Sequence, residues 1–114
     1  MGKRAYAGSL YGPLSPVCDF GAGGLERVEG AELTVNLHLG VRLLLERGID
    51  AVPFLLARLG GRVLVGDEIG AGVVPADPFE RRWRDETGSL YQALAARADI
   101  VDRVWAGLPV RLKG

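Results

Sequence analysis

The sequence predicts an α/β protein with a mostly parallel sheet and an antiparallel strand pair at its C-terminal edge. Short apolar runs alternate with helical patterns, which is typical of parallel strands joined by helical crossovers. A tight Gly-Leu-Pro connection precedes the last run, and such turns join antiparallel strands. We expect the 114 residues to form one domain, with a helix and a Gly/Pro-rich loop at 1–30 and a sheet-and-helix core at 31–114.

The N-terminal segment is expected to hold one short helix and two short strands. The helix is expected within residues 1–12, and the glycines and prolines of residues 12–30 predict a loop with a brief strand at 17–20. The run at 33–35 is apolar and partly β-branched, so it predicts a buried strand.

The middle of the chain predicts two helices and a strand. Leucine and valine recur at helical spacing over residues 37–47, and a second helical run is expected at 54–59, opened by Asp50 and Pro53. Residues 62–65 form a continuous apolar run, typical of a strand buried on both faces of a parallel sheet.

The last third begins with the clearest helix signal. Asp77 can cap the free backbone N–H groups and Pro78 suits the first helical position, so a helix is expected at 78–97. Strands are expected at 101–106 and at 110–113, joined by a turn.

Composition excludes several classes of function. Lys+Arg and Asp+Glu are both 14, so the formal net charge is zero, and a basic nucleic-acid surface is not expected. No run reaches the roughly 18 apolar residues of a membrane span, and no signal-peptide core is found. The one cysteine, Cys18, excludes an intrachain disulfide and is expected to be a small buried residue. We therefore expect a cytoplasmic protein without nucleic-acid or membrane partners.

An acidic, glycine-rich segment follows the strand at 62–65. Ligands of open α/β sheets bind beyond the carboxyl ends of strands, so Asp67 and Glu68 could act as a general base or as Mg²⁺ ligands. Gly70 and Gly72 would let backbone N–H groups approach an anion. The alternative is a crossover loop whose acids cap a helix or remain solvated.

Two further features allow a functional and a structural interpretation. Arg81, Arg82 and Arg84 open the long helix and could bind a phosphate, or they could form a solvated charged face. His38 is the single histidine, and its place after a strand favours a hydrogen-bonded packing residue over a nucleophile. Trp83 and Trp105 are expected in the core.

The C-terminal half resembles the adenosylcobinamide kinase/adenosylcobinamide-phosphate guanylyltransferase family of cobalamin biosynthesis. The resemblance lies in three ordered motifs over about residues 62–114: Asp-Glu-Ile-Gly-Ala-Gly-Val-Val-Pro at 67–75, Arg-Arg-Trp-Arg-Asp at 81–85, and Gly-Leu-Pro-Val-Arg-Leu-Lys at 107–113. It favours a site role for the acidic loop and for the arginines.

The N-terminal half resembles the same family more loosely, as a shortened and divergent form. Gly2 and Lys3 look like the tail of the family's phosphate loop, which runs into its first helix. Arg4 stands where the loop has Ser or Thr, and Asn36 stands near the place of a Walker B acid. The resemblance implies a P-loop NTPase-like sheet that lacks the usual first strand.

The family resemblance implies phosphoryl transfer from a purine nucleoside triphosphate to adenosylcobinamide, followed by GMP transfer. It implies GTP or ATP with Mg²⁺ as cofactor and a homo-oligomer. Lys3 and Gly2, with Gly70, Gly72, Arg81 and Arg82, would bind nucleotide, while Glu68, Asp67 and Arg84 would be catalytic, Glu68 also holding the metal. The alternative is a non-catalytic relative that keeps the fold for binding or assembly. A third interpretation is an α/β domain of unrelated purpose.

Overall fold

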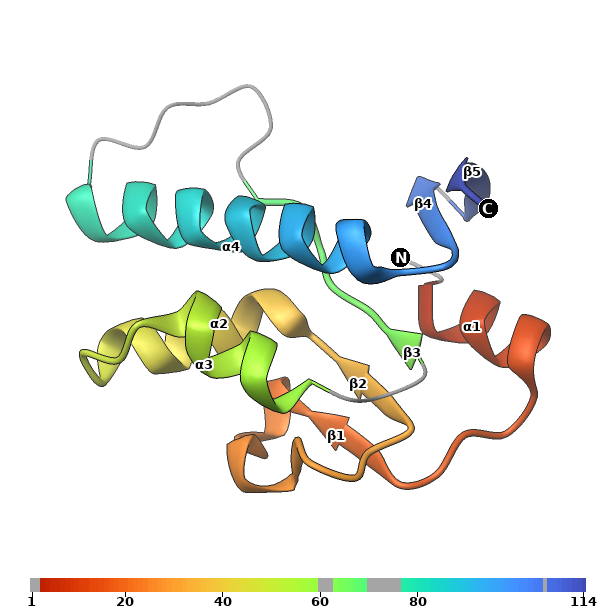
Figure 1. Ribbon diagram of the computed structural model, residues 1–114, viewed down its shortest axis with the longest axis horizontal. Coiled ribbons are helices and arrows are strands. Elements are labelled where there is room, and N and C mark those ends of the chain that lie inside the picture. The colour runs from red at the N-terminus through yellow and green to blue at the C-terminus, as the bar shows by residue number, and fades with distance from the viewer. Residues whose placement is uncertain (1–2, 60–62, 70–76, 106) are drawn as a thin grey trace.

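Two sheets of different kinds organise the fold (Figure 1). The computed structural model describes residues 3–59, 63–69, 77–105 and 107–114. Its elements are, in chain order, α1 (Lys3–Tyr11), β1 (Val17–Asp19), the 3-10 turns η1 (Phe20–Ala22) and η2 (Leu25–Arg27), β2 (Leu33–Val35), α2 (Leu37–Glu46), α3 (Ala51–Arg58), β3 (Val63–Leu64), α4 (Pro78–Arg97), β4 (Val101–Trp105) and β5 (Leu108–Lys113).

The first sheet is parallel and has the strand order β1-β2-β3. β2 pairs with β1 from Val17↔Leu33 to Asp19↔Val35 and with β3 at Leu33↔Val63. All three residues of β2 are buried, as expected of a strand covered on both faces. The predicted α/β fold with a parallel sheet is therefore confirmed.

The second sheet is the antiparallel pair β4–β5, which confirms the predicted antiparallel pairing. Among the described residues it forms a sheet of its own rather than an edge of the parallel sheet. Hydrogen bonds from two side chains attach it to the helices: Tyr6 Oη of α1 donates to Asp102 Oδ2 at 2.9 Å, and Lys113 Nζ donates to the Ala95 and Ala96 carbonyls of α4 at 2.9 and 3.4 Å. In Figure 1, β4 and β5 accordingly lie with α1 near the C-terminal end of α4.

α4 has the predicted bounds, because its start is fixed by a side-chain cap. Asp77 Oδ1 accepts a hydrogen bond from the backbone N–H of Phe79 at 2.8 Å, and Pro78 occupies the first turn. The helix ends where Ala98 turns to extended backbone. α4 packs against α2 and α3 (Figure 1). No helix in the described part of the chain combines the length and apolarity that a membrane crossing requires.

The core lies between the parallel sheet and α2, α3 and α4. Its fully buried side chains include Phe20, Leu44, Leu55 and Leu90. Cys18 is fully buried as predicted, and its Sγ contacts the Gly24 carbonyl oxygen at 3.1 Å. Trp83 is partly buried against this core.

Several element boundaries differ from the sequence predictions. β3 ends at Leu64 rather than at residue 65, and its two residues are half-buried rather than buried. α2 and α3 each end one residue earlier than predicted. α3 begins at Ala51, not at residue 54, because Pro53 falls within the first turn, where its missing N–H leaves no bond unmade. The strand predicted at 17–20 ends at Asp19, since Phe20 starts a 3-10 turn capped by the Asp19 side chain. β5 begins at Leu108, two residues before the predicted strand. Residues 62 and 106, which were also predicted as strand, lie outside the described residues.

Candidate functional site

The carboxyl ends of the three parallel strands carry polar side chains. Asp19 ends β1, Asn36 follows β2, and Asp67 follows β3 after two further residues. Parallel strands present their carboxyl ends at the same edge of a sheet, which is where α/β proteins bind ligands. This edge is therefore the candidate site.

Asp19 and Asn36 form a fixed pair at the ends of β1 and β2. Asn36 adopts a left-handed backbone conformation with φ of 59°, which turns the chain sharply from β2 into α2. Its side-chain Nδ2 donates to Asp19 Oδ1 at 2.7 Å, and the backbone N–H of Gly21 donates to the same oxygen at 2.8 Å. These bonds fix the orientation of the Asn36 amide and leave its Oδ1 outside this pairing.

Lys3 and Asp67 meet across the sheet edge, although they come from opposite halves of the chain. Lys3 Nζ lies 2.9 Å from Asp67 Oδ1, with a quarter of the lysine side chain and just over half of the aspartate side chain exposed. The hydrogen bond between them raises the pKa of Lys3 and lowers the pKa of Asp67. Both groups are therefore charged at neutral pH.

His38 lies beside Asp67 and is buried. Its Nδ1 accepts the backbone N–H of Asp67 at 3.1 Å, and its Nε2 lies 3.7 Å from Asp67 Oδ2. Burial lowers the pKa of His38, although the nearby Asp67 carboxylate opposes this effect. Trp83 binds the backbone of the same residue, because its Nε1 donates to the His38 carbonyl oxygen at 2.7 Å.

Tyr91 of α4 binds the same loop. Its hydroxyl donates to the Asp67 carbonyl oxygen at 2.6 Å, and burial raises the pKa of Tyr91 well above its usual value. Gly66 is required at this point, because a Cβ on residue 66 would overlap the tyrosine hydroxyl. Both the backbone N–H and the backbone carbonyl of Asp67 are thus hydrogen-bonded.

Glu68 is exposed and paired with a cation. Arg103 of β4 lies with its Nε 2.8 Å from Glu68 Oε1. In the described residues no group of three or more His, Cys, Asp or Glu side chains could hold a metal ion by itself. Mg²⁺ bound to a nucleotide needs only one or two protein carboxylates besides the phosphates, so Asp67 and Glu68 fit that donor set.

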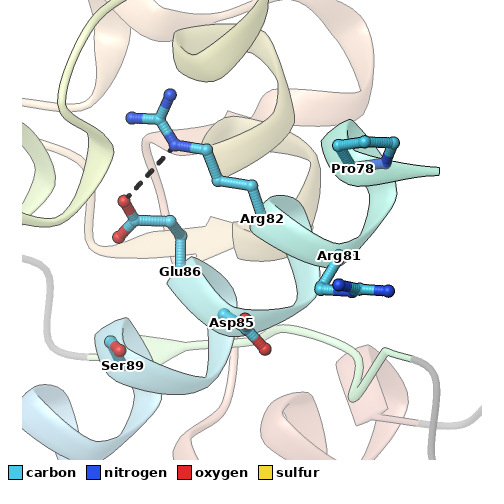
Figure 2. A pocket seen from close by; sticks show the side chains of 6 residues that line it. All are labelled: Pro78, Arg81, Arg82, Asp85, Glu86 and Ser89. Atoms are coloured by element: carbon cyan, nitrogen blue, oxygen red, sulfur yellow. Dashed lines mark ion pairs between the residues drawn. The ribbon is translucent and has the colours of Figure 1, made fainter. Parts of the chain in front are cut away.

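The three predicted arginines lie on the first turns of α4. Arg82 Nε lies 3.8 Å from Glu86 Oε1, and Arg84 Nη2 lies 3.4 Å from Asp85 Oδ1. This part of α4 lines a shallow hollow of about 310 Å³. In Figure 2, Arg81 and Arg82 point in different directions, and Arg82 faces Glu86. Tyr91, which contacts the acidic loop, lies about 14 Å further along the helix axis than Arg82. The phosphate role of the arginines stays a prediction.

The structure brings together part of the predicted site and adds residues that the sequence did not indicate. Lys3 and Asp67 form one cluster, and Glu68 follows directly. The predicted Gly2, Gly70 and Gly72 lie outside the described residues. Sequence reasoning treated His38 as a packing residue and gave no role to Asp19, Tyr91 or Arg103. The single available signal was that His38 and Asn36 follow a strand.

Comparisons with known proteins identify relatives of one kind. A model of the cobinamide kinase / cobinamide phosphate guanyltransferase family matches residues 46–112, which is more than half of the chain. The bifunctional adenosylcobalamin biosynthesis protein CobP of Pseudomonas aeruginosa is 50% identical over 66 residues, covering 57% of this chain and 38% of that protein. CobU of Salmonella typhimurium, of the same description, is 45% identical over 74 residues, covering 60% of this chain and 41% of that protein.

The similarity is therefore strong but partial. The matched parts span about two fifths of the length of these two relatives. The family match includes Asp67, Glu68 and the arginines of α4, whereas Lys3, Asn36 and His38 precede it.

Proposed function

Because the chain belongs to the cobinamide kinase / cobinamide phosphate guanyltransferase family, we propose that it binds a purine nucleoside triphosphate. We propose further that it serves phosphoryl and GMP transfer to an adenosylcobinamide-type substrate. The observation that carries the proposal is the contact of Lys3 Nζ with Asp67 Oδ1 at 2.9 Å. It joins a flexible cation and a carboxylate at the sheet edge that α/β proteins use for ligands.

The proposed roles follow from charge and reach. Lys3 starts α1, where its ammonium would leave Asp67 and bind the phosphates, because a triphosphate carries more negative charge than one carboxylate. Free N–H groups in the first turn of α1 would favour the same anion. Gly2, Gly70 and Gly72 would contribute backbone N–H groups, and Arg81, Arg82 and Arg84 would stabilise the charge that develops during transfer.

Asp67 and Glu68 would hold Mg²⁺ together with the nucleotide phosphates. When bound, the ion would neutralise phosphate charge and align the oxygen atoms for transfer. Asp67 is already oriented by His38 and Tyr91. Glu68 is more than half exposed and would have to leave Arg103 to serve as a ligand or base.

The need for Glu68 to leave Arg103 favours a second candidate function. In this structure Arg103 neutralises Glu68, as a permanent ion pair would. A relative that binds nucleotide without transferring it, and that acts in binding or assembly, would not need a free Glu68 carboxylate. The two functions predict the same affinity for nucleotide and different turnover.

The test is calorimetric titration of GTP with Mg²⁺ into the 114-residue chain, with ATP as comparison. We expect a Kd in the micromolar range and a loss of at least tenfold in Lys3→Met. Lys113→Met is the matched control, because that lysine binds carbonyl groups of α4. No heat at millimolar nucleotide, together with no thermal stabilisation, would overturn nucleotide binding.

A transfer assay then separates the two functions. Formation of adenosylcobinamide phosphate by the chain, lost in Glu68→Gln, supports the enzyme. Nucleotide binding without product, unchanged in Glu68→Gln, supports the non-catalytic relative.

We also propose that the chain forms a homo-oligomer, is located in the cytoplasm, and folds as a single domain over residues 1–114. Light scattering of the purified chain checks the first of these, and a mass of one chain at high concentration would contradict it.

A further inference from the structure

We propose that His38 is a positioning residue of the site, a neutral imidazole protonated on Nε2 that fixes the backbone of Asp67 so that its carboxylate faces Lys3. The expected effect of His38 on the affinity for nucleotide rests on the proposed function, whereas its effect on the position of Asp67 does not. Neither the family match nor the relatives' names assign a role to this residue, which precedes the matched segment.

The hydrogen bonds of His38 define which of its ring nitrogens carries the proton. Nδ1 lies 3.1 Å from the backbone nitrogen of Asp67, which always carries its hydrogen. A ring nitrogen that accepts an N–H holds no proton of its own, so the proton of the neutral ring resides on Nε2. Nε2 lies 3.7 Å from Asp67 Oδ2, which is too long for a direct hydrogen bond, although the dipole of the Nε2–H group still attracts the carboxylate.

The imidazole ring of His38 lies in a buried environment. His38 is 9% exposed and sits in the first turn of α2, two residues after the left-handed Asn36. The indole N–H of Trp83 binds the histidine carbonyl, and the two rings lie 6.4 Å apart. Because the ring is buried, its freedom to rotate is already restricted, and it can therefore orient a neighbour.

His38 is one of three side chains that fix the position of Asp67. Four bonding groups of this residue have neighbours from three helices: the N–H binds His38 of α2, the carbonyl binds Tyr91 of α4, and one carboxylate oxygen binds Lys3 of α1 while the other faces His38 Nε2. Asp67 itself is exposed and lies in a loop. Without the acceptor on His38, the backbone N–H of Asp67 would hydrogen-bond to water instead, and the Asp67 carboxylate would lose its fixed direction.

The test uses the fact that this chain has one histidine. Long-range ¹H–¹⁵N spectra of the wild-type chain at pH 8 contain a single imidazole, so its tautomer can be assigned without ambiguity. We expect the Nε2–H tautomer with an unprotonated Nδ1. The Nδ1–H tautomer would overturn the proposal, and this measurement needs no variant to fold.

Two variants test the effect on Asp67. His38→Asn keeps an acceptor near the position of Nδ1, whereas His38→Phe keeps the ring and loses the acceptor. We expect amide exchange at Asp67 to accelerate about fivefold to tenfold in His38→Phe and to change less in His38→Asn, as the loss of one hydrogen bond implies. Equal exchange in wild type and His38→Phe would overturn the proposal.

Nucleotide titration of the same variants separates this inference from the proposed function. If wild type binds GTP, we expect His38→Phe to weaken it severalfold and His38→Asn to restore most of the loss. If wild type binds no nucleotide, the proposed function fails, and the tautomer and exchange measurements still decide the role of His38.

Discussion

The hydroxyl of Tyr91 occupies the space in which a side chain at Gly66 would begin. The same hydroxyl donates to the carbonyl oxygen of Asp67 at 2.6 Å, so one tyrosine both excludes a Cβ at residue 66 and binds the next residue. The glycine after β3 is thus a consequence of the way α4 packs on the loop. It need not be a ligand-binding glycine.

Gly66→Ala should therefore destabilise the chain. The added Cβ must displace the phenol ring or the loop, at a cost of about 1–3 kcal/mol as in other overpacked interiors. Urea denaturation measures the change, and Tyr91→Phe should reduce the cost of Gly66→Ala because it removes the overlapping oxygen. Gly88→Ala is the control: nothing lies within 4 Å of its Cβ position, and a helical Gly→Ala change should stabilise by about 0.5–1 kcal/mol. A loss in Gly88→Ala equal to that in Gly66→Ala would contradict this account.

The ion pair of Lys3 and Asp67 should show a measurable but modest coupling. Both side chains are partly exposed, so a double-mutant cycle of Lys3→Met and Asp67→Asn should give about 0.5–1 kcal/mol in low salt. The value should decrease in 1 M NaCl, where screening is strong. The Arg82–Glu86 pair on α4, with atoms 3.8 Å apart, is the comparison and should give a smaller coupling. Zero coupling for Lys3 with Asp67 would mean that α1 does not hold the lysine at the site.

Tyr6 should make stability depend on alkaline pH. Its hydrogen bond to Asp102 raises the pKa of Tyr6 above the usual value of about 10, with Arg111 acting in the opposite direction. The unfolded chain therefore loses this proton at lower pH than the folded chain. The stabilisation by Tyr6 should be complete below about pH 10 and disappear as the pH rises through the folded pKa.

Denaturation of wild type and Tyr6→Phe at pH 8, 9, 10 and 11 measures this effect. The difference in free energy of unfolding should be constant up to pH 9 and shrink above pH 10. Tyr11→Phe, at the exposed end of α1, controls for the loss of a hydroxyl. A difference that grows with pH would contradict the assigned hydrogen bond.

Local signals in the sequence are sufficient to predict those helices and strands whose boundaries are fixed by neighbouring residues. α4 was predicted at its observed bounds because Asp77 and Pro78 act within one turn of the helix start. The predicted start of α3 at residue 54 is three residues too late, because Pro53 does not mark the start of the helix: a proline is accommodated anywhere in the first turn. The antiparallel pairing of β4 and β5 followed from a short connection.

The candidate site was only partly predictable, because its contacts join distant segments. Asp67 and Glu68 could be found from their place after an apolar run. The contact of His38 with the Asp67 backbone requires knowing that β2 and β3 are neighbours, which no local pattern reveals. The arginines illustrate the opposite case, since their sequence cluster suggests one phosphate clamp, whereas the side chains of Arg81 and Arg82 point in different directions (Figure 2).

The hydrogen bond between Tyr6 and Asp102 joins residues that are 96 positions apart. During synthesis the parallel sheet can begin to form once residue 64 has left the ribosome, because its three strands lie within the first 64 residues. α1 cannot gain its contact with β4 until about 40 more residues have been translated, at a rate of roughly 5–20 residues per second. The lysine that completes the charged cluster is therefore the first residue of a helix that docks late. A nascent chain would acquire its sheet some seconds before its N-terminal helix is secured.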